Sequence, residues 1–138
     1  MGMPYTGGCA CGAIRYEISG EPVFSNDCQC LDCQHESGTG HGSHLSFARS
    51  AAGIGISGEA RFWSMTADSG HIKTRAFCPA CGAPVYMTFA AMPDIFTIRA
   101  ASLDDPGRYR PQVVTYAVRG HAWDRLDPDI PKFERMPT

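Results

Sequence analysis

The chain has 138 residues, a length that suits one domain with a buried core of its own. Its formal net charge is −2, its pI is about 6.2, and it contains no basic cluster, so the composition does not indicate a nucleic-acid-binding protein. No apolar run approaches the ~20 residues of a membrane-spanning helix, and no secretory signal segment is visible, so we expect no membrane partner.

Short segments of alternating polarity predict a mainly β protein. In residues 13–18, Ile14, Tyr16 and Ile18 face one side and charged residues face the other, which is the period of a half-buried strand. Turn signals that contain glycine or proline separate the segments, and the chain has 15 glycines and 10 prolines. Six further strands are expected at residues 44–48, 60–64, 71–77, 85–89, 95–100 and 113–118.

Helix is expected to be a minor component. No segment shows a helical period over three turns, and at most a single turn is predicted to follow Cys33 or Asp104. The tail from Asp124 onward contains three prolines and is expected to be extended or irregular. These features predict one domain over residues 1–138, with an antiparallel sandwich or barrel-like sheet and little helix.

The cysteines are grouped in three tight clusters whose spacing indicates metal binding. Spacings of one or two residues hold thiolates close enough to share one tetrahedral ion, and Zn²⁺ favours such soft ligands. The odd count and the CxC and CxxC spacings argue against a secreted disulfide scaffold, so we expect a reducing, cytoplasmic setting. The clusters are Cys9 and Cys11, then Cys28, Cys30 and Cys33, then Cys78 and Cys81.

The segment FCPACG around Cys78 and Cys81 is typical of a zinc knuckle. Pro79 preorganises the turn and Gly82 permits a positive φ, so backbone N–H groups can point at the sulfurs. A knuckle supplies two ligands, and two more must come from the N-terminal pair or from the central cluster. We favour the N-terminal pair, because it closes one four-thiolate site and leaves the central cluster intact. A Cys78–Cys81 disulfide is the weaker alternative.

The central cluster, Cys28, Cys30 and Cys33, is called the cysteine trio below. It can cap one face of a second zinc ion and leave the fourth position open, which is typical of a catalytic site, whereas a closed site is structural. One alternative is a redox pair of Cys30 and Cys33, although no βαβ pattern accompanies it. Another is a site closed by a fourth protein ligand, for which the candidates are His35, His41, His44 and His71.

The charge of an open three-thiolate site favours a thiol substrate over water. Zn²⁺ with three thiolates carries one net negative charge, so it acidifies bound water less than zinc held by neutral histidines does. A thiol is a softer ligand and loses its proton on coordination. The thiolate could then attack a small electrophilic carbonyl, which indicates a zinc enzyme. The alternative function is a zinc-stabilised binding module without chemistry, whose second site is closed or vacant.

The motifs, taken in order, resemble the glutathione-dependent formaldehyde-activating enzyme family, which also includes centromere protein V relatives. The resemblance implies a zinc-bound, mainly antiparallel β fold described as tent-like, with two zinc ions per chain. The segments that carry it extend from Gly7 to Phe133 and are GGCACGAIRYEI, CQCLDCQHESG, GEARFW, FCPACGAPVYM, ASLDDPGRY and DIPKF.

The same resemblance implies an activity and a set of ligands. The family's name-giving reaction condenses formaldehyde with glutathione to S-(hydroxymethyl)glutathione and is classed with the carbon–sulfur lyases, so glutathione and a small aldehyde are the expected partners. Where the family often has CHC this chain has CQC, so a role for that histidine would pass to His35, His41 or His44. By resemblance, the structural zinc ligands are Cys9, Cys11, Cys78 and Cys81, and the ligands of a second, catalytic zinc are Cys28, Cys30 and Cys33.

Overall fold

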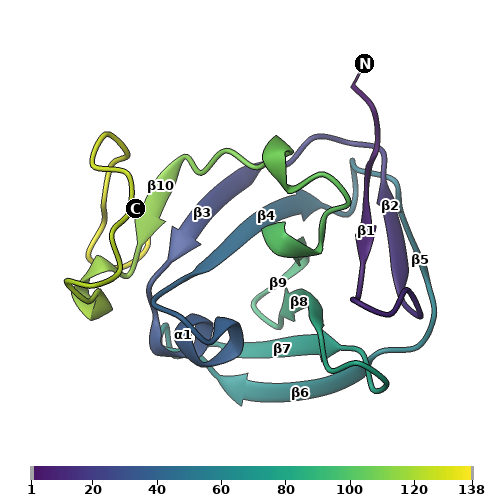
Figure 1. The fold of residues 1–138 in the computed structure, drawn as a ribbon, viewed down its shortest axis with the longest axis horizontal. Helices are drawn as coiled ribbons and strands as arrows, with labels where there is room; N and C mark the ends of the chain where they lie inside the picture. Colours follow the sequence, from purple (N-terminus) through teal and green to yellow (C-terminus); the bar gives the residue numbers. More distant parts are fainter. Residues whose placement is uncertain (1, 138) are drawn as a thin grey trace.

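The computed structural model describes residues 2–137, whose strands form two sheets (Figure 1). The smaller sheet has three antiparallel strands in the order β1-β2-β5, and the larger has seven in the order β10-β3-β4-β9-β8-β7-β6. The prediction of a mainly β fold is confirmed. The strands are β1 (Tyr5–Gly8), β2 (Arg15–Ile18), β3 (Phe24–Cys28), β4 (Gly42–Ala48), β5 (Ile54–Ser57), β6 (Arg61–Thr66), β7 (Ile72–Phe77), β8 (Pro84–Phe89), β9 (Met92–Arg99) and β10 (Val113–Thr115).

The hydrophobic core includes residues from both sheets. In β2, Tyr16 and Ile18 are buried and Glu17 is exposed, as the alternation in the sequence predicted. They belong to one cluster with Phe47 of β4 and Phe96 of β9, which have no exposed surface. Burial of each such side chain contributes about 1.5–3 kcal/mol, so this cluster holds the two sheets together.

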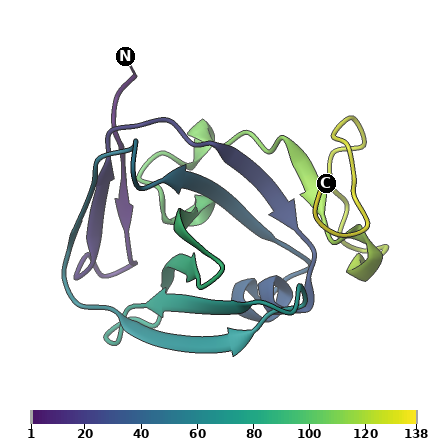
Figure 2. The ribbon, with the colours of Figure 1, turned by 180° about the vertical axis from the view of Figure 1, so that it is seen from behind.

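Other positions on the large sheet line a pocket. Pairing places Asn26 of β3 opposite His44 of β4, and Lys73 of β7 opposite Phe89 of β8. The sheet is strongly bent, so that its two ends lie along different sides of the molecule (Figures 1 and 2). These four side chains, from widely separated strands, therefore line a common pocket.

Helix α1 (Leu31–Ser37) lies between β3 and β4 in the chain. The prediction of at most one turn following Cys33 is wrong, because the helix has seven residues and contains Cys33. Its two ends are set locally: the Cys30 sulfur accepts a hydrogen bond from the Cys33 N–H, and Gly38 ends the helix in the left-handed conformation with φ 76°. In the described residues, the longest helix is far too short to cross a bilayer.

Within residues 2–137, three single 3₁₀ turns complete the regular structure. A turn does follow Asp104, with the Asp105 side chain accepting a hydrogen bond from the Gly107 N–H. The three turns are η1 (Ala100–Ser102), η2 (Pro106–Arg108) and η3 (Ala117–Arg119).

Strands β1, β3 and β5 were not predicted from the sequence. Strand β3 is the clearest case, since its central residues are polar and yet buried. Asn26 donates to the Thr115 hydroxyl at 2.9 Å, and Asp27 accepts a hydrogen bond from Tyr109 at 2.7 Å. Tertiary partners thus satisfy polar groups that would otherwise oppose burial.

The fold is mainly antiparallel, as expected, and one pair of strands is parallel: β10 with β3. Residues 100–112 carry the chain from β9, inside the sheet, to the sheet's far edge, and β10 therefore enters beside β3 in the same direction. Residues 125–137 of the tail form no helix or strand, and Phe133 donates its N–H to the Val114 carbonyl at 2.9 Å. The tail therefore lies along β10.

Candidate metal centres

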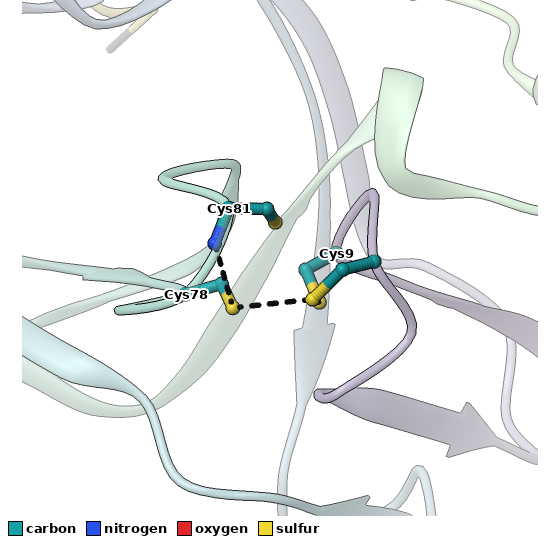
Figure 3. A group of neighbouring side chains, drawn as sticks. Cys9, Cys78 and Cys81 are labelled. Carbon is teal, nitrogen blue, oxygen red and sulfur yellow. Dashed lines mark hydrogen bonds between the residues drawn. The ribbon is translucent and has the colours of Figure 1, made fainter.

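Two turns that are far apart in the sequence bring four cysteine sulfurs together (Figure 3). Cys9 and Cys11 follow β1, Cys78 and Cys81 lie between β7 and β8, and all four Sγ atoms are within 4.8 Å of one another. The Cys9–Cys11 and Cys11–Cys78 sulfur distances are both 3.7 Å. Sulfurs at the corners of a tetrahedron with Zn–S bonds of ~2.3 Å are about 3.8 Å apart, so this donor set fits Zn²⁺. All four thiols are free, so no disulfide joins Cys78 to Cys81.

The turn that carries Cys78 and Cys81 has the form of a knuckle. The Ala80 N–H donates to the Cys78 sulfur at 3.3 Å, and Gly82 has the positive φ of 76° that the turn requires. A backbone hydrogen bond from Ala83 is the main cause that lowers the pKa of the Cys81 thiol. The backbone of this turn therefore stabilises the thiolate form, which is the form that binds a metal ion.

The cysteine trio forms the second sulfur cluster. Cys28 ends β3, Cys30 caps α1 and Cys33 lies inside the helix, and all three are buried with their Sγ atoms within 4.8 Å of one another. The thiols of Cys28 and Cys33 donate hydrogen bonds to the Cys30 thiolate, and these lower the pKa of Cys30 strongly. The cluster therefore gives up its first proton readily, and three converging thiols of this kind fit a soft divalent ion.

In the described residues, no histidine joins the trio to make a fourth ligand. The set of potential ligand atoms that lie within 4.8 Å of one another contains the three sulfurs and no histidine nitrogen. His44 Nε2 comes within 3.9 Å of the Cys33 sulfur, but Arg99 Nη1 lies 2.6 Å from the same nitrogen. A guanidinium only donates hydrogen bonds, so the Nε2 lone pair of His44 is already engaged.

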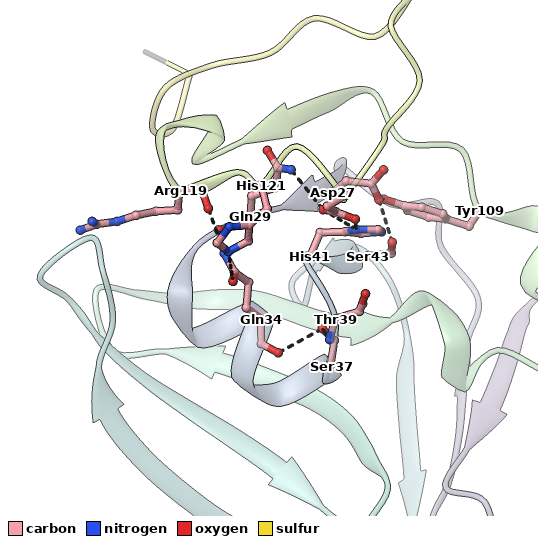
Figure 4. A network of polar contacts seen from close by, with 11 residues as sticks. Asp27, Gln29, Gln34, Ser37, Thr39, His41, Ser43, Tyr109, Arg119 and His121 are labelled. Atoms are coloured by element: carbon pink, nitrogen blue, oxygen red, sulfur yellow. Dashed lines mark hydrogen bonds and ion pairs between the residues drawn. The ribbon is translucent and has the colours of Figure 1, made fainter.

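The other three candidate histidines make different contacts. His35 is exposed on α1, and His71 is exposed at the pocket. His41 Nδ1 lies 2.9 Å from the Asp124 carboxylate, to which Gln29 also donates at 3.1 Å (Figure 4). Gln29 and His41 therefore bind the C-terminal segment, and neither lines the pocket that the trio lines.

A buried ion pair holds α1 against the large sheet. Arg99 Nη1 of β9 lies 2.9 Å from Glu36 Oε1 of α1, and the two side chains are only 7% and 4% exposed. Because Arg99 also contacts His44, this pair fixes the surroundings of Cys33.

Replacing Glu36 with leucine is expected to lower the free energy of unfolding by about 3–5 kcal/mol, because Arg99 would remain buried without its counter-charge. The double variant Glu36→Leu/Arg99→Leu should lose less, since no uncompensated charge remains. Urea unfolding followed by circular dichroism measures both, with the exposed Glu59→Gln as the control. A Glu36→Leu protein as stable as the control would contradict the importance of this pair.

A pocket of about 740 Å³ opens beside the trio, a size typical of small-molecule sites. Its polar part includes Ser46 and Thr97, whose hydroxyls are 2.8 Å apart. A smaller hollow of about 310 Å³ beside Tyr5 and Arg108 has no cysteine or histidine in its wall. The apolar wall of the large pocket is formed by Val23, Phe24, Met87, Phe89, Ala91, Met92 and Ile95, and the C-terminal Met136 and Pro137 also contact it.

Two basic residues near the trio were not predicted from the sequence: Lys73, and Arg99, which contacts His44. Lys73 Nζ lies 3.9 Å from the Cys33 sulfur. Alternation in residues 71–77 places Lys73 and Arg75 on one face of a strand, but nothing local shows that this face lines a pocket. Only the pairing of strands far apart in the sequence reveals it.

A family model described as glutathione-dependent formaldehyde-activating enzyme matches residues 4–119. The matched span contains all seven cysteines of the two sulfur clusters. It ends before the DIPKF segment, so the part of the resemblance beyond residue 119 lies outside the match. Because the match covers most of the chain, this protein belongs to the glutathione-dependent formaldehyde-activating enzyme family.

Proposed function

We propose that the chain is a zinc-dependent, carbon–sulfur lyase-type enzyme that joins the thiol of glutathione to formaldehyde and catalyses the reverse cleavage. Family membership supports glutathione-dependent formaldehyde activation in general. The observation that carries the finer proposal is the cysteine trio: in the described residues three buried thiols converge beside a pocket, with no fourth protein ligand in their cluster. Since thiols must stay reduced to hold a metal ion, we place this activity in a reducing compartment such as the cytoplasm.

The two sulfur clusters have different tasks in this proposal. Cys9, Cys11, Cys78 and Cys81 would hold a structural zinc that ties together turns whose nearest cysteines are 67 residues apart. Cys28, Cys30 and Cys33 would hold the second zinc, which when bound supplies a soft acceptor for a thiol sulfur and lowers the pKa of that thiol.

The reaction itself balances without a further reagent. The thiol gives up its proton, and an electron pair of its sulfur forms the new bond to the carbonyl carbon. The π pair of the C=O bond moves to the oxygen, which takes up one proton to give the hydroxymethyl product. In the reverse direction the C–S bond breaks and the aldehyde leaves. The pocket beside the trio has room to hold both reactants in contact, which favours the bimolecular step.

Protein with two zinc ions per chain is expected to accelerate adduct formation from glutathione and formaldehyde at least tenfold over buffer, because the pocket holds the reactants together. Exchange NMR measures the rate of adduct formation. In a cobalt-substituted sample, added glutathione should produce a new sulfur-to-metal charge-transfer band. Glutathione disulfide, which has no free thiol, is the control and should give no band.

The two measurements separate the enzyme from a binding module. A band without acceleration would contradict the proposed reaction but retain thiol binding. No band and no acceleration, with two metal ions bound, would favour a zinc-stabilised module whose second site carries no chemistry.

A further inference from the structure

Lys73 is a buried lysine that has no acidic partner among residues 2–137. Its side chain lies on β7, is 3% exposed, and is flanked across the strands by Met65 and Phe89. In the described residues, no Asp or Glu oxygen lies within 4.0 Å of its ammonium group, and its one hydrogen-bond contact is the Cys33 sulfur at 3.9 Å. An unpaired ammonium is costly to bury. A negative charge close to the trio would therefore stabilise Lys73 in its buried position.

Arg135 also lines the pocket, and in the described residues its side chain makes no hydrogen bond to a sulfur of the trio. Three arginines elsewhere in this part of the molecule are already engaged. Arg99 pairs with Glu36, and Arg119 pairs with Asp68. Arg75 stacks on an exposed tryptophan of β6, with its guanidinium 5.1 Å from the ring centre. In the described residues, Lys73 is therefore the basic side chain whose ammonium hydrogen-bonds to a sulfur of the trio.

The ammonium of Lys73 would balance negative charge on the trio when a divalent ion and a thiolate are bound. Three thiolates and one divalent ion carry one net negative charge, and entry of a fourth thiolate raises this to two. Two uncompensated negative charges on a buried group of thiolates and metal ion are unfavourable. One adjacent cation reduces the net charge from −2 to −1. An ammonium also has three N–H donors, of which one contact, to Cys33, is present. Lys73 is also one of the residues that line the pocket, so a ligand bound there lies beside its side chain.

We propose that Lys73 is the counter-ion of the trio, which favours binding of a thiol as its anion and donates a hydrogen bond to the aldehyde oxygen as that oxygen gains negative charge. This inference rests on the proposed function. When the sulfur bonds to the carbon, the π pair of the carbonyl moves to the oxygen, and a fixed ammonium stabilises this charge. The contribution of Lys73 in this proposal is electrostatic.

The chain has two lysines, Lys73 and Lys132, and this makes a matched comparison possible. Lys132 is exposed in the C-terminal segment, so Lys132→Met is the control for Lys73→Met. In cobalt-substituted protein, Lys73→Met is expected to bind the second metal ion and then glutathione at least tenfold more weakly than wild type. Lys73→Arg should recover most of both affinities, and Lys132→Met should match wild type.

A second readout uses the native side chain. In zinc-loaded protein with ¹³C-labelled lysine Cε, addition of glutathione should shift the signal of Lys73 and leave that of Lys132 in place. Unchanged metal and glutathione affinities in Lys73→Met would overturn the proposal. So would a loss of metal that Lys73→Arg does not recover, because that result indicates a packing role.

The comparison of metal affinity between wild type and the Lys73 variants needs no thiol. It therefore tests the counter-ion role even if the wild-type protein fails to bind glutathione. That failure would instead contradict the proposed function. A wild-type protein that binds glutathione without accelerating adduct formation contradicts only the reaction, and the glutathione affinities of the variants still decide the role of Lys73.

Discussion

Replacing Cys78 with serine is expected to abolish the folded state at 25 °C. Cys78 has no exposed surface, and its sulfur lies 3.7 Å from that of Cys11 in the four-cysteine cluster. A structural zinc contributes ~10–16 kcal/mol of apparent binding free energy, which is comparable with the ~5–15 kcal/mol stability of a whole domain. Without this ligand, the turn between β7 and β8 loses its link to the turn that follows β1.

Circular dichroism and metal analysis measure this effect directly. The Cys78→Ser protein should lack a cooperative thermal transition and bind less than one zinc per chain. A strong chelator added to wild type should produce the same loss, and renewed zinc should reverse it. A Cys78→Ser protein that melts like wild type and retains two zinc ions would show that the cluster is not a structural metal site.

Replacing Cys30 with serine is expected to remove activity while leaving the fold intact. Cys30 caps α1 by accepting the Cys33 N–H, and a serine hydroxyl performs the same capping task well. Oxygen is a poorer ligand than thiolate for a soft ion, however, so the second zinc should be lost. We expect the zinc content to fall from two to one per chain and the rate of adduct formation to fall at least 100-fold.

The Cys30→Ser variant is the experimental control for Cys78→Ser, and the reverse, because each removes one thiol from a different cluster. Their contrast distinguishes a metal site that supports folding from one that supports chemistry. Adduct formation at the wild-type rate in Cys30→Ser protein with one zinc ion would exclude the trio from the reaction. Unfolding of Cys30→Ser would show instead that both clusters are needed for folding.

Sequence patterns predicted the parts of the fold that depend on short-range chemistry. The alternation of Tyr16 and Ile18 with Glu17 identified β2 and its buried face, because side chains alternate along any strand. The knuckle turn around Gly82 was predictable for the same reason, since few residues adopt a positive φ easily. The short helix after Cys30 was underestimated, because its caps are local but its stability comes from contacts such as that between Glu36 and Arg99.

The site was predictable only where its members are neighbours in the chain. The spacing of Cys28, Cys30 and Cys33 implies that these three sulfurs can meet, because a helix cap and one turn span that distance. The contact between Lys73 and Cys33 joins residues 40 positions apart, and no local pattern predicts it.

The amino-acid sequence by itself determined the class of fold, the soft donor atoms and their local grouping, since alternation and spacing act over a few residues. The tertiary structure decided how the clusters combine, that His44 is engaged by Arg99, and that a lone ammonium lies beside the trio. The physical reason is that these contacts depend on the order and bending of strands β3, β4, β9, β8 and β7. Strand order is set by burial across the whole chain, and no single segment contains that information.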